Sequence, residues 1–230
     1  MRARKLTLLI TAGPTVEDID PVRFISNRAT GKLGAAIARA AVNQGHRAIL
    51  IHGPISDSVL KTLPRAKGLS EIAVRSAADM HAAVMKNISK ADAVVMSAAV
   101  ADFTPVDVSG VKLKKASSGL VIRLKPTIDI LKALGLKKSR GGKFALIGFA
   151  LETGSGKTAA ERRAARVSEA QRKLRDKNLD AIVLDSPHAM GAEASDFTVI
   201  SRNGNVRQFR AMSKTDFAKV LVALAQSTVK

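Results

Sequence analysis

The sequence predicts an α/β fold: a Rossmann-like, mostly parallel sheet with helices on both faces, plus a β-hairpin near the C-terminus. Short apolar runs alternate with amphipathic stretches along the chain, as is typical of parallel strands joined by covering helices. Asn203-Gly204 separates two further strand-like runs, which is a strong hairpin signal. This hairpin fits either an antiparallel edge of the sheet or an added subdomain.

Each element follows from its pattern of apolar residues. Strands are expected at residues 6–11, 48–52, 72–74, 93–97, 144–149, 181–184, 197–201 and 206–210. The runs at 6–11 and 93–97 are apolar without alternation, so they predict strands that are buried on both faces. Helices are expected at 34–44, 77–88, 158–177 and 215–226. The first of them consists largely of small residues, which favours close packing on a sheet.

The composition excludes several classes of protein. Of 230 residues, 46% are hydrophobic, which is too many for a disordered chain. The absence of cysteine excludes a disulfide scaffold and a cysteine nucleophile, metal ligand or redox centre. No apolar run approaches the roughly 18 residues of a membrane span, so no membrane partner is expected. The length favours a single domain over residues 1–230, and the absence of an export signal favours the cytoplasm.

The charge balance has two interpretations. The chain carries 38 Lys+Arg and 19 Asp+Glu, a formal net charge of +19. Such an excess fits a nucleic-acid partner or an enzyme that binds phosphorylated substrates. Aromatic residues make up 3% of the chain, with no Tyr or Trp, which argues against stacking on single-stranded bases.

Two motifs near the N-terminus indicate a site for an anion. Residues 11–15, TAGPT, follow the first strand, and open α/β sheets bind ligands at the carboxyl ends of their strands. Residues 20–34, DPVRFISNRATGKLG, open the first helix, where backbone amides favour anions. The side chains expected to face a phosphorylated ligand are Ser26, Asn27, Arg28, Thr30 and Lys32. The alternatives are an ordinary turn for the first motif and helix capping for the second.

The segment at about 104–119 has no clear period, so it is either disordered or a functional lid. It contains VKLKK at residues 111–115. Three lysines near a nucleotide could neutralise a triphosphate or a pyrophosphate leaving group. The composition by itself favours a solvated basic loop.

Three other patterns are set aside. GSGKT at residues 154–158 lacks the first P-loop glycine, because Leu151 occupies that position, so it is interpreted as a helix-entry turn. GxGxxG and tyrosine are both absent, which disfavours an NAD(P)-dependent oxidoreductase. The histidines show no metal-ligand spacing, and the metal ligands stay unknown. They are His46, His52, His81 and His188.

Taken together, five segments resemble the phosphopantothenoylcysteine synthetase family of coenzyme A biosynthesis. They are residues 10–41, SAAVADF at 97–103, KLKK at 112–115, IGFALET at 147–153 and KNLD at 177–180. The resemblance implies a Rossmann-like homodimer and a two-step ligation. A nucleoside triphosphate, with Mg²⁺, activates the carboxylate of 4′-phosphopantothenate and releases pyrophosphate. Cysteine then attacks the acyl-nucleotidyl intermediate to form 4′-phosphopantothenoylcysteine. Bacterial members typically use CTP and eukaryotic members ATP.

The resemblance also implies roles for individual residues. Asn27 would bind the intermediate and support its conversion, and Lys112 would serve the activation step, which makes these two the catalytic residues. The implied nucleotide-binding residues are Met96, Ser97, Ala98, Asp102, Lys112, Thr127, Ile128, Asp129, Ile130, Phe149, Lys173 and Lys177. The expected substrate-binding residues are Gly13, Arg23, Asn27 and Lys32.

The chain departs from the family in several respects. Many bacterial members read Lys-Asn-Pro-Asp-Ile where this chain has KPTIDI at residues 125–130. Many are also fused to a flavin-dependent decarboxylase, which these 230 residues do not contain. We therefore expect no FMN, and a separate phosphopantothenoylcysteine decarboxylase as a candidate partner. The alternative function is a basic Rossmann-type nucleic-acid-binding protein without catalysis, whose binding would weaken steeply with salt.

Overall fold

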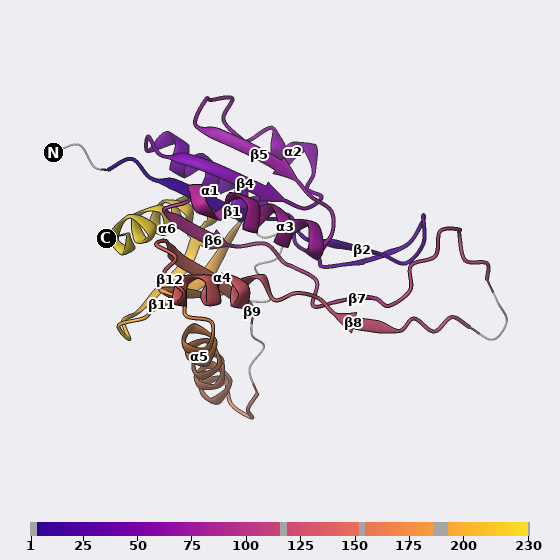
Figure 1. Cartoon of the computed structure of the whole chain (residues 1–230). Coiled ribbons are helices and arrows are strands. Elements are labelled where there is room, and N and C mark those ends of the chain that lie inside the picture. The colour runs from indigo at the N-terminus through magenta and orange to yellow at the C-terminus, as the bar shows by residue number, and fades with distance from the viewer. Residues whose placement is uncertain (1–3, 116–118, 152–154, 186–192, 230) are drawn as a thin grey trace.

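The computed structural model describes residues 4–115, 119–151, 155–185 and 193–229. An eight-stranded sheet forms its body (Figure 1). The strands are β1 Thr7–Ala12, β4 Arg47–His52, β5 Leu69–Ala73, β6 Ala93–Met96, β9 Ala145–Leu151, β10 Ala181–Asp185, β11 Ala194–Ser201 and β12 Val206–Ser213. Their order across the sheet is β12-β11-β10-β9-β6-β1-β4-β5.

The strand order confirms the Rossmann-like fold. Neighbouring strands from β5 to β10 pair in parallel. The chain runs outward from β1 through β4 to β5, then returns to β6 beside β1 and continues to the other side. The carboxyl ends of β1 and β6 therefore form the topological switch point, where such sheets bind ligands. The predicted hairpin is the antiparallel edge β11–β12 of the same sheet.

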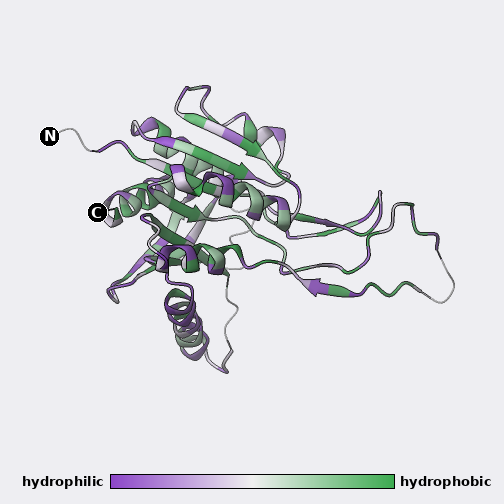
Figure 2. Cartoon of the chain, viewed as in Figure 1, coloured by the Kyte–Doolittle hydropathy of each residue, from purple (hydrophilic) through white to green (hydrophobic). Residues whose placement is uncertain are grey.

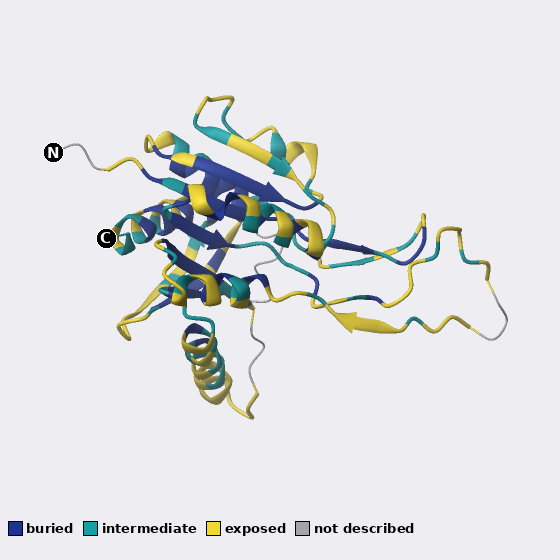
Figure 3. Cartoon of the chain, viewed as in Figure 1, coloured by how far each residue is buried: buried dark blue, intermediate teal, exposed yellow. Residues whose placement is uncertain are grey.

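Helices cover both faces of the sheet, as predicted. They are α1 Lys32–Asn43, α2 Asp57–Leu60, α3 Ala77–Asn87, α4 Ile130–Ser139, α5 Ala159–Asp176 and α6 Lys214–Thr228, with a 3₁₀ turn at Ile88–Lys90. Successive residues of β1 alternate between two cores, with Ile10 packing in the core of α1 and α6 and Leu9 in that of α3, α4 and α5. Figure 3 shows the central strands buried between these layers.

The hydropathy of each helix and strand agrees with its position in the fold. Figure 2 shows mostly hydrophobic central strands and a mostly hydrophilic α5. Thr158 caps α5, accepting from the backbone N–H of Glu161, whose carboxylate in turn accepts from the N–H of Thr158. Residues 155–158 therefore form the predicted helix-entry turn, whereas Gly154 lies outside the described residues. None of the described helices is both long enough and apolar enough to cross a membrane.

An arm projects from the body, and its described residues are 16–26, 103–115 and 119–126 (Figure 1). It contains two antiparallel pairs, β2 Val16–Asp18 with β3 Phe24–Ser26 and β7 Phe103–Pro105 with β8 Leu124–Pro126. The start of the expected 104–119 loop thus belongs to β7. At the base of the arm, the Thr127 N–H donates to the Asp102 carbonyl at 2.9 Å and the Thr127 hydroxyl to the Ala101 carbonyl at 2.6 Å.

Candidate active site

The segments that follow β1 and β6 are tied together at the switch point. The Ser97 hydroxyl donates to the Thr11 carbonyl at 2.6 Å, and the Ala98 N–H donates to the Thr11 hydroxyl at 3.2 Å. Further along, the Ala101 N–H donates to the Thr15 hydroxyl at 2.9 Å. Threonine and serine therefore satisfy backbone groups beyond the sheet, and this holds the floor of a cleft.

The start of α1 lies directly against the end of β1. Gly31 precedes the helix with a φ of 76°, a conformation that favours glycine. A Cβ on Gly34, in the first turn, would come within 2.4 Å of the Ala12 Cβ. These glycines let the first backbone N–H groups of α1 approach the cleft closely, and such groups with the helix dipole attract anions.

A cleft of about 780 Å³ opens at this point. Its lining contains every residue of the predicted site except Arg23 and Lys112. These lining residues are Gly13, Asn27, Lys32, Met96, Ser97, Ala98, Asp102, Thr127, Ile128, Asp129, Ile130, Phe149, Lys173 and Lys177. Ser26, Arg28 and Thr30, which were expected to face a phosphorylated ligand, line it as well. The fold thus gathers segments that lie far apart in the sequence.

Asn27 joins two walls of the cleft. Its side-chain amide donates to the Ala99 carbonyl at 3.0 Å and to the Val100 carbonyl at 3.2 Å. These contacts fix the loop before α1 against the segment that follows β6. Asn27 is therefore held at the junction of the two motifs that the sequence singled out.

A lysine–carboxylate pair stands on the opposite wall. The Lys177 ammonium lies 2.8 Å from a carboxylate oxygen of Asp129, which also caps α4 by accepting from the Lys132 N–H at 2.9 Å. Burial by itself would raise the pKa of Asp129, but Lys177 and the Lys132 N–H outweigh it and hold the pKa below its ordinary value. Asp129 is therefore ionised at neutral pH, which keeps the Lys177 ammonium in place.

Lys214, the first residue of α6, also lines the cleft, and sequence reasoning missed it. Only 8% of it is exposed. Burial lowers its pKa, the charge of Lys32 acts in the same direction, and Asp185 and Glu193 act against it. Lys32 itself is paired with Glu193. A serine cap at Ser213 signals the start of a helix in the sequence, but the approach to the cleft depends on the packing of α6 against α1.

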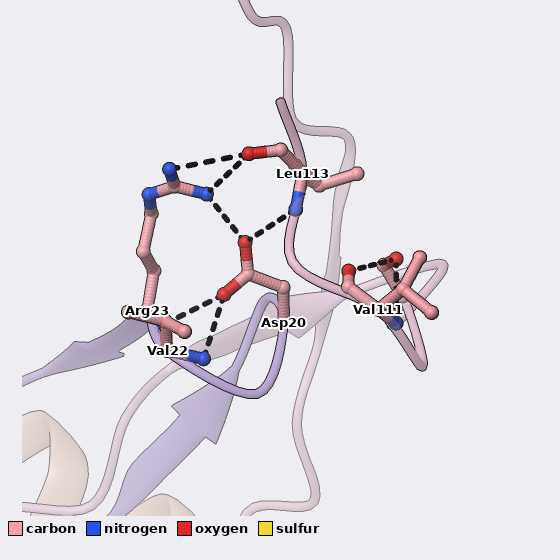
Figure 4. Close-up of polar contacts among 6 residues, drawn as sticks. Asp20, Val22, Arg23, Val111 and Leu113 are labelled. Carbon is pink, nitrogen blue, oxygen red and sulfur yellow. Dashed lines mark hydrogen bonds and ion pairs between the residues drawn. The ribbon is translucent and has the colours of Figure 1, made fainter. Parts of the chain in front are cut away.

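Arg23 and Lys112 lie on the arm. The Arg23 guanidinium pairs with Asp20 and donates to the Leu113 carbonyl (Figure 4). Lys112 is exposed and immediately precedes Leu113. Neither residue lines the cleft of its own chain, so their expected roles in binding and activation stay predictions.

No resident metal centre is built from the part of the chain that the structure describes. Within it, no group of three or more His, Cys, Asp or Glu side chains could hold a metal ion. His46 and His52 make buried hydrogen bonds away from the cleft, and His188 lies outside the described residues.

The strand order and the cleft define a Rossmann-like α/β protein with cationic side chains around a ligand site at its switch point. Residues 3–228 match the family described as the DNA/pantothenate metabolism flavoprotein C-terminal domain. The chain belongs to this family, which confirms its resemblance to the phosphopantothenoylcysteine synthetases.

Known relatives agree with this assignment. The chain is 43% identical over 230 residues to the coenzyme A biosynthesis bifunctional protein CoaBC of Bacillus subtilis (strain 168), covering 96% of this chain and 52% of that protein. It therefore spans about half the length of this relative. The crystal structure of a CoaBC C-terminal domain has a TM-score of 0.77 and 34% identity, covering 98% of this chain and 96% of that one.

A more distant structure shares the fold. The Cab2 mutant H337A in complex with phosphopantothenate-cysteine has a TM-score of 0.75 at 14% identity, and the match covers 96% of this chain and 86% of that one.

Proposed function

We propose that this chain is a phosphopantothenate–cysteine ligase of coenzyme A biosynthesis. In the first step a nucleoside triphosphate, CTP or ATP, converts the carboxylate of 4′-phosphopantothenate into an acyl-nucleotidyl anhydride and releases pyrophosphate. In the second step the amino group of cysteine attacks this anhydride, forming the amide and releasing the nucleoside monophosphate. The observation that carries the proposal is the cleft at the switch point, which collects residues from four of the five segments that resemble the family.

The cleft offers separate places for the two substrates. The N-terminus of α1, with Lys32 and the buried Lys214 beside it, suits the phosphate of phosphopantothenate. The opposite wall, with Asp102, Lys173 and Lys177, suits the nucleotide. Asn27 stands at the junction of the β1 and β6 segments, where the carboxylate and the α-phosphate would meet.

The chemistry relies on position and charge. A carboxylate is a poor acyl donor, and the anhydride supplies a good leaving group without any nucleophile from the chain. Lysine side chains offset the negative charge that develops on the phosphates, and holding both substrates in one cleft removes much of the entropy cost of their encounter. Mg²⁺ would enter with the nucleotide, since this ion keeps several waters and commonly binds through substrate phosphates.

The same proposal includes a homodimer formed through the arm. Phe24 and Phe103 on the arm are 56% and 52% exposed, and an apolar surface of this kind favours a partner. Association of two copies through their arms would let Lys112 serve the cleft of the second copy. Sedimentation of the wild-type chain and of Phe103→Ser tests this, because the proposal expects a dimer that the substitution weakens.

The test of the ligase is pyrophosphate release by the purified chain with 4′-phosphopantothenate and Mg²⁺. CTP and ATP are compared, each with and without cysteine. The proposal expects release that depends on phosphopantothenate, and amide product only when cysteine is added. Absence of release with both nucleotides would contradict it and favour the nucleic-acid alternative, for which binding should weaken by orders of magnitude as salt rises.

A further inference from the structure

Asp20 occupies the centre of a polar cluster on the arm (Figure 4). Its residue surface is only 2% exposed. One carboxylate oxygen, Oδ1, accepts from the backbone N–H groups of Val22 and Arg23, each at 2.8 Å. The other, Oδ2, accepts from the Leu113 N–H at 3.1 Å and is paired with the Arg23 guanidinium. The first oxygen therefore shapes the turn before β3, and the second reaches across to residues 109–113, the segment that carries Lys112 and is called the lysine segment below.

The lysine segment is held at both ends. The Arg23 guanidinium donates to the Leu113 carbonyl at 3.2 and 3.3 Å, so both backbone groups of Leu113 are bound to one turn. At the other end, the Ser109 N–H donates to the Ile19 carbonyl at 3.0 Å. Lys112 stands between these two anchors, on a stretch of chain without regular secondary structure.

The charge of Asp20 strengthens these contacts. Burial by itself would raise the pKa of Asp20, but the N–H groups of Val22, Leu113 and Arg23, with the Arg23 charge, hold the pKa below its ordinary value. The carboxylate is therefore ionised at neutral pH, and hydrogen bonds to an ionised acceptor are stronger than neutral ones. By contrast, the Arg123–Asp107 pair of the same arm is exposed at 3.2 Å, where ion pairs contribute little.

We propose that Asp20 is a positioning residue for Lys112, fixing the backbone of the lysine segment through Leu113 so that the Lys112 ammonium is presented to the phosphates. This inference rests on the proposed function, because it concerns the activation step. A lysine side chain is a flexible point charge, and a fixed backbone limits where its ammonium can go. A misplacement of about 1 Å can cost on the order of 100-fold in rate.

Asp20→Asn tests the proposal. If the asparagine oxygen keeps the turn contacts, its amide donors face the Leu113 N–H and the Arg23 guanidinium, which are also donors. We expect phosphopantothenate-dependent pyrophosphate release to fall by about 10- to 100-fold. Binding of phosphopantothenate without nucleotide, measured by calorimetry, should be unchanged. Asp107→Asn is the matched control, since it neutralises an exposed carboxylate of the same arm, and it should keep the wild-type rate.

A double substitution distinguishes positioning from a separate contribution. In the Lys112→Ala background, Asp20→Asn should cause no further loss of pyrophosphate release, because no ammonium is left to position. Independent losses that multiply would overturn the proposal, as would wild-type release by Asp20→Asn alone. Loss of phosphopantothenate binding in Asp20→Asn would also overturn it, because Asp20 would then act on the substrate through Arg23, the expected substrate-binding residue with which it pairs.

Hydrogen exchange of the Leu113 amide provides a readout that needs no activity. The wild-type amide should be protected, and Asp20→Asn should speed its exchange at least tenfold, whereas Asp107→Asn should not. Equal exchange in all three proteins would overturn the positioning role even if the ligase is active. A different outcome is faster Leu113 exchange in Asp20→Asn together with no pyrophosphate release by the wild-type chain. That outcome would refute the proposed function, and the positioning role would fail with it.

Discussion

The wall of the cleft and the arm hold their side chains by different means. The cleft rests on strands such as β1 and β6, whose Leu9, Ile10, Val94 and Val95 are fully buried. The arm exposes apolar side chains and attaches its lysine segment through a few polar contacts around Asp20. Burial stabilises in proportion to area, whereas a polar contact mainly fixes a position. Changes in the body should therefore appear as lost stability, and changes in the arm as lost rate.

The largest expected effect is in the body, at Phe217 of α6. Its ring is fully buried and stacked on Phe197, with centroids 3.8 Å apart and an interplanar angle of 2°. Phe217→Ala should lower the free energy of unfolding by about 3–5 kcal/mol, because it leaves a cavity in the core. Urea titration measures this. Phe103→Ala on the arm, at a concentration where the chain is monomeric, is the control and should change stability by less than about 0.5 kcal/mol. Similar losses in both variants would remove the contrast.

Lys112→Ala should produce the opposite pattern. We expect nucleotide-dependent pyrophosphate release to fall by about 10²–10³-fold, the effect of removing one electrostatic contact to developing charge. The free energy of unfolding should stay within about 0.5 kcal/mol of the wild-type value, since the side chain is exposed. Lys125→Ala removes another exposed lysine of the arm and should keep most of the rate. Wild-type release by Lys112→Ala would refute its role.

Asn27→Asp sharpens the comparison within the cleft. The substitution replaces an amide donor with a carboxylate that faces the Ala99 and Val100 carbonyls and adds negative charge beside phosphates. Conversion of the intermediate should slow by about 10- to 100-fold, the range of a lost hydrogen bond to a charged group. Single-turnover assays should show the acyl-nucleotidyl species accumulating. Asn27→Ser keeps the site neutral and should be less impaired, and amide formation at the normal rate in Asn27→Asp would count against the assignment.

The smallest expected effect is a pH dependence of the stability of the body, which arises at His46. His46 is buried, and its Nδ1 accepts from the Leu6 N–H at 3.2 Å, which requires a neutral ring. Burial, helped by the charge of Lys5, lowers the pKa of His46. The unfolded chain therefore binds more protons than the folded chain. The contribution of His46 to the free energy of unfolding is fully present above about pH 6.5, and it is lost as the pH drops through the folded-state pKa.

The loss at His46 should be about 1 kcal/mol or less, the contribution of one hydrogen bond. It can be measured by urea titration between about pH 5 and pH 7.5, a range that spans the ordinary histidine pKa. His46→Asn should flatten this dependence, because asparagine accepts the same bond without titrating. An equally steep slope in His46→Asn would assign the pH dependence to other groups.

The body of the fold could be predicted from the sequence because its strands are continuous apolar runs. Helix α4 could not, because Gly135 interrupts it and glycine weakens a helix. The structure explains this glycine, since a Cβ there would come within 2.1 Å of the Lys177 carbonyl. The arm also escaped prediction, because strands of three residues are too short to show a period.

The candidate site, like the fold, could be predicted only in part. The motifs with Gly13 and Ser97 follow the carboxyl ends of β1 and β6. Their proximity could be predicted, because the carboxyl ends of parallel strands share one edge of the sheet. Lys214 joins the cleft through the packing of α6 on α1, which no local pattern encodes. The contact between Asp20 and Leu113 likewise depends on two distant loops meeting on the arm.

The arm also affects the conformational entropy that the chain loses on folding. The segments 103–115 and 119–126 leave the body and return to it at the bonds between Thr127 and the carbonyls of Ala101 and Asp102. The pairing of β6 with β9 does not involve the residues of the arm. The entropy lost in closing a loop grows only with the logarithm of its length, about 0.6 kcal/mol for each doubling. The length of the arm is therefore almost neutral for the body, and insertions or deletions there can alter its reach while the sheet folds as before.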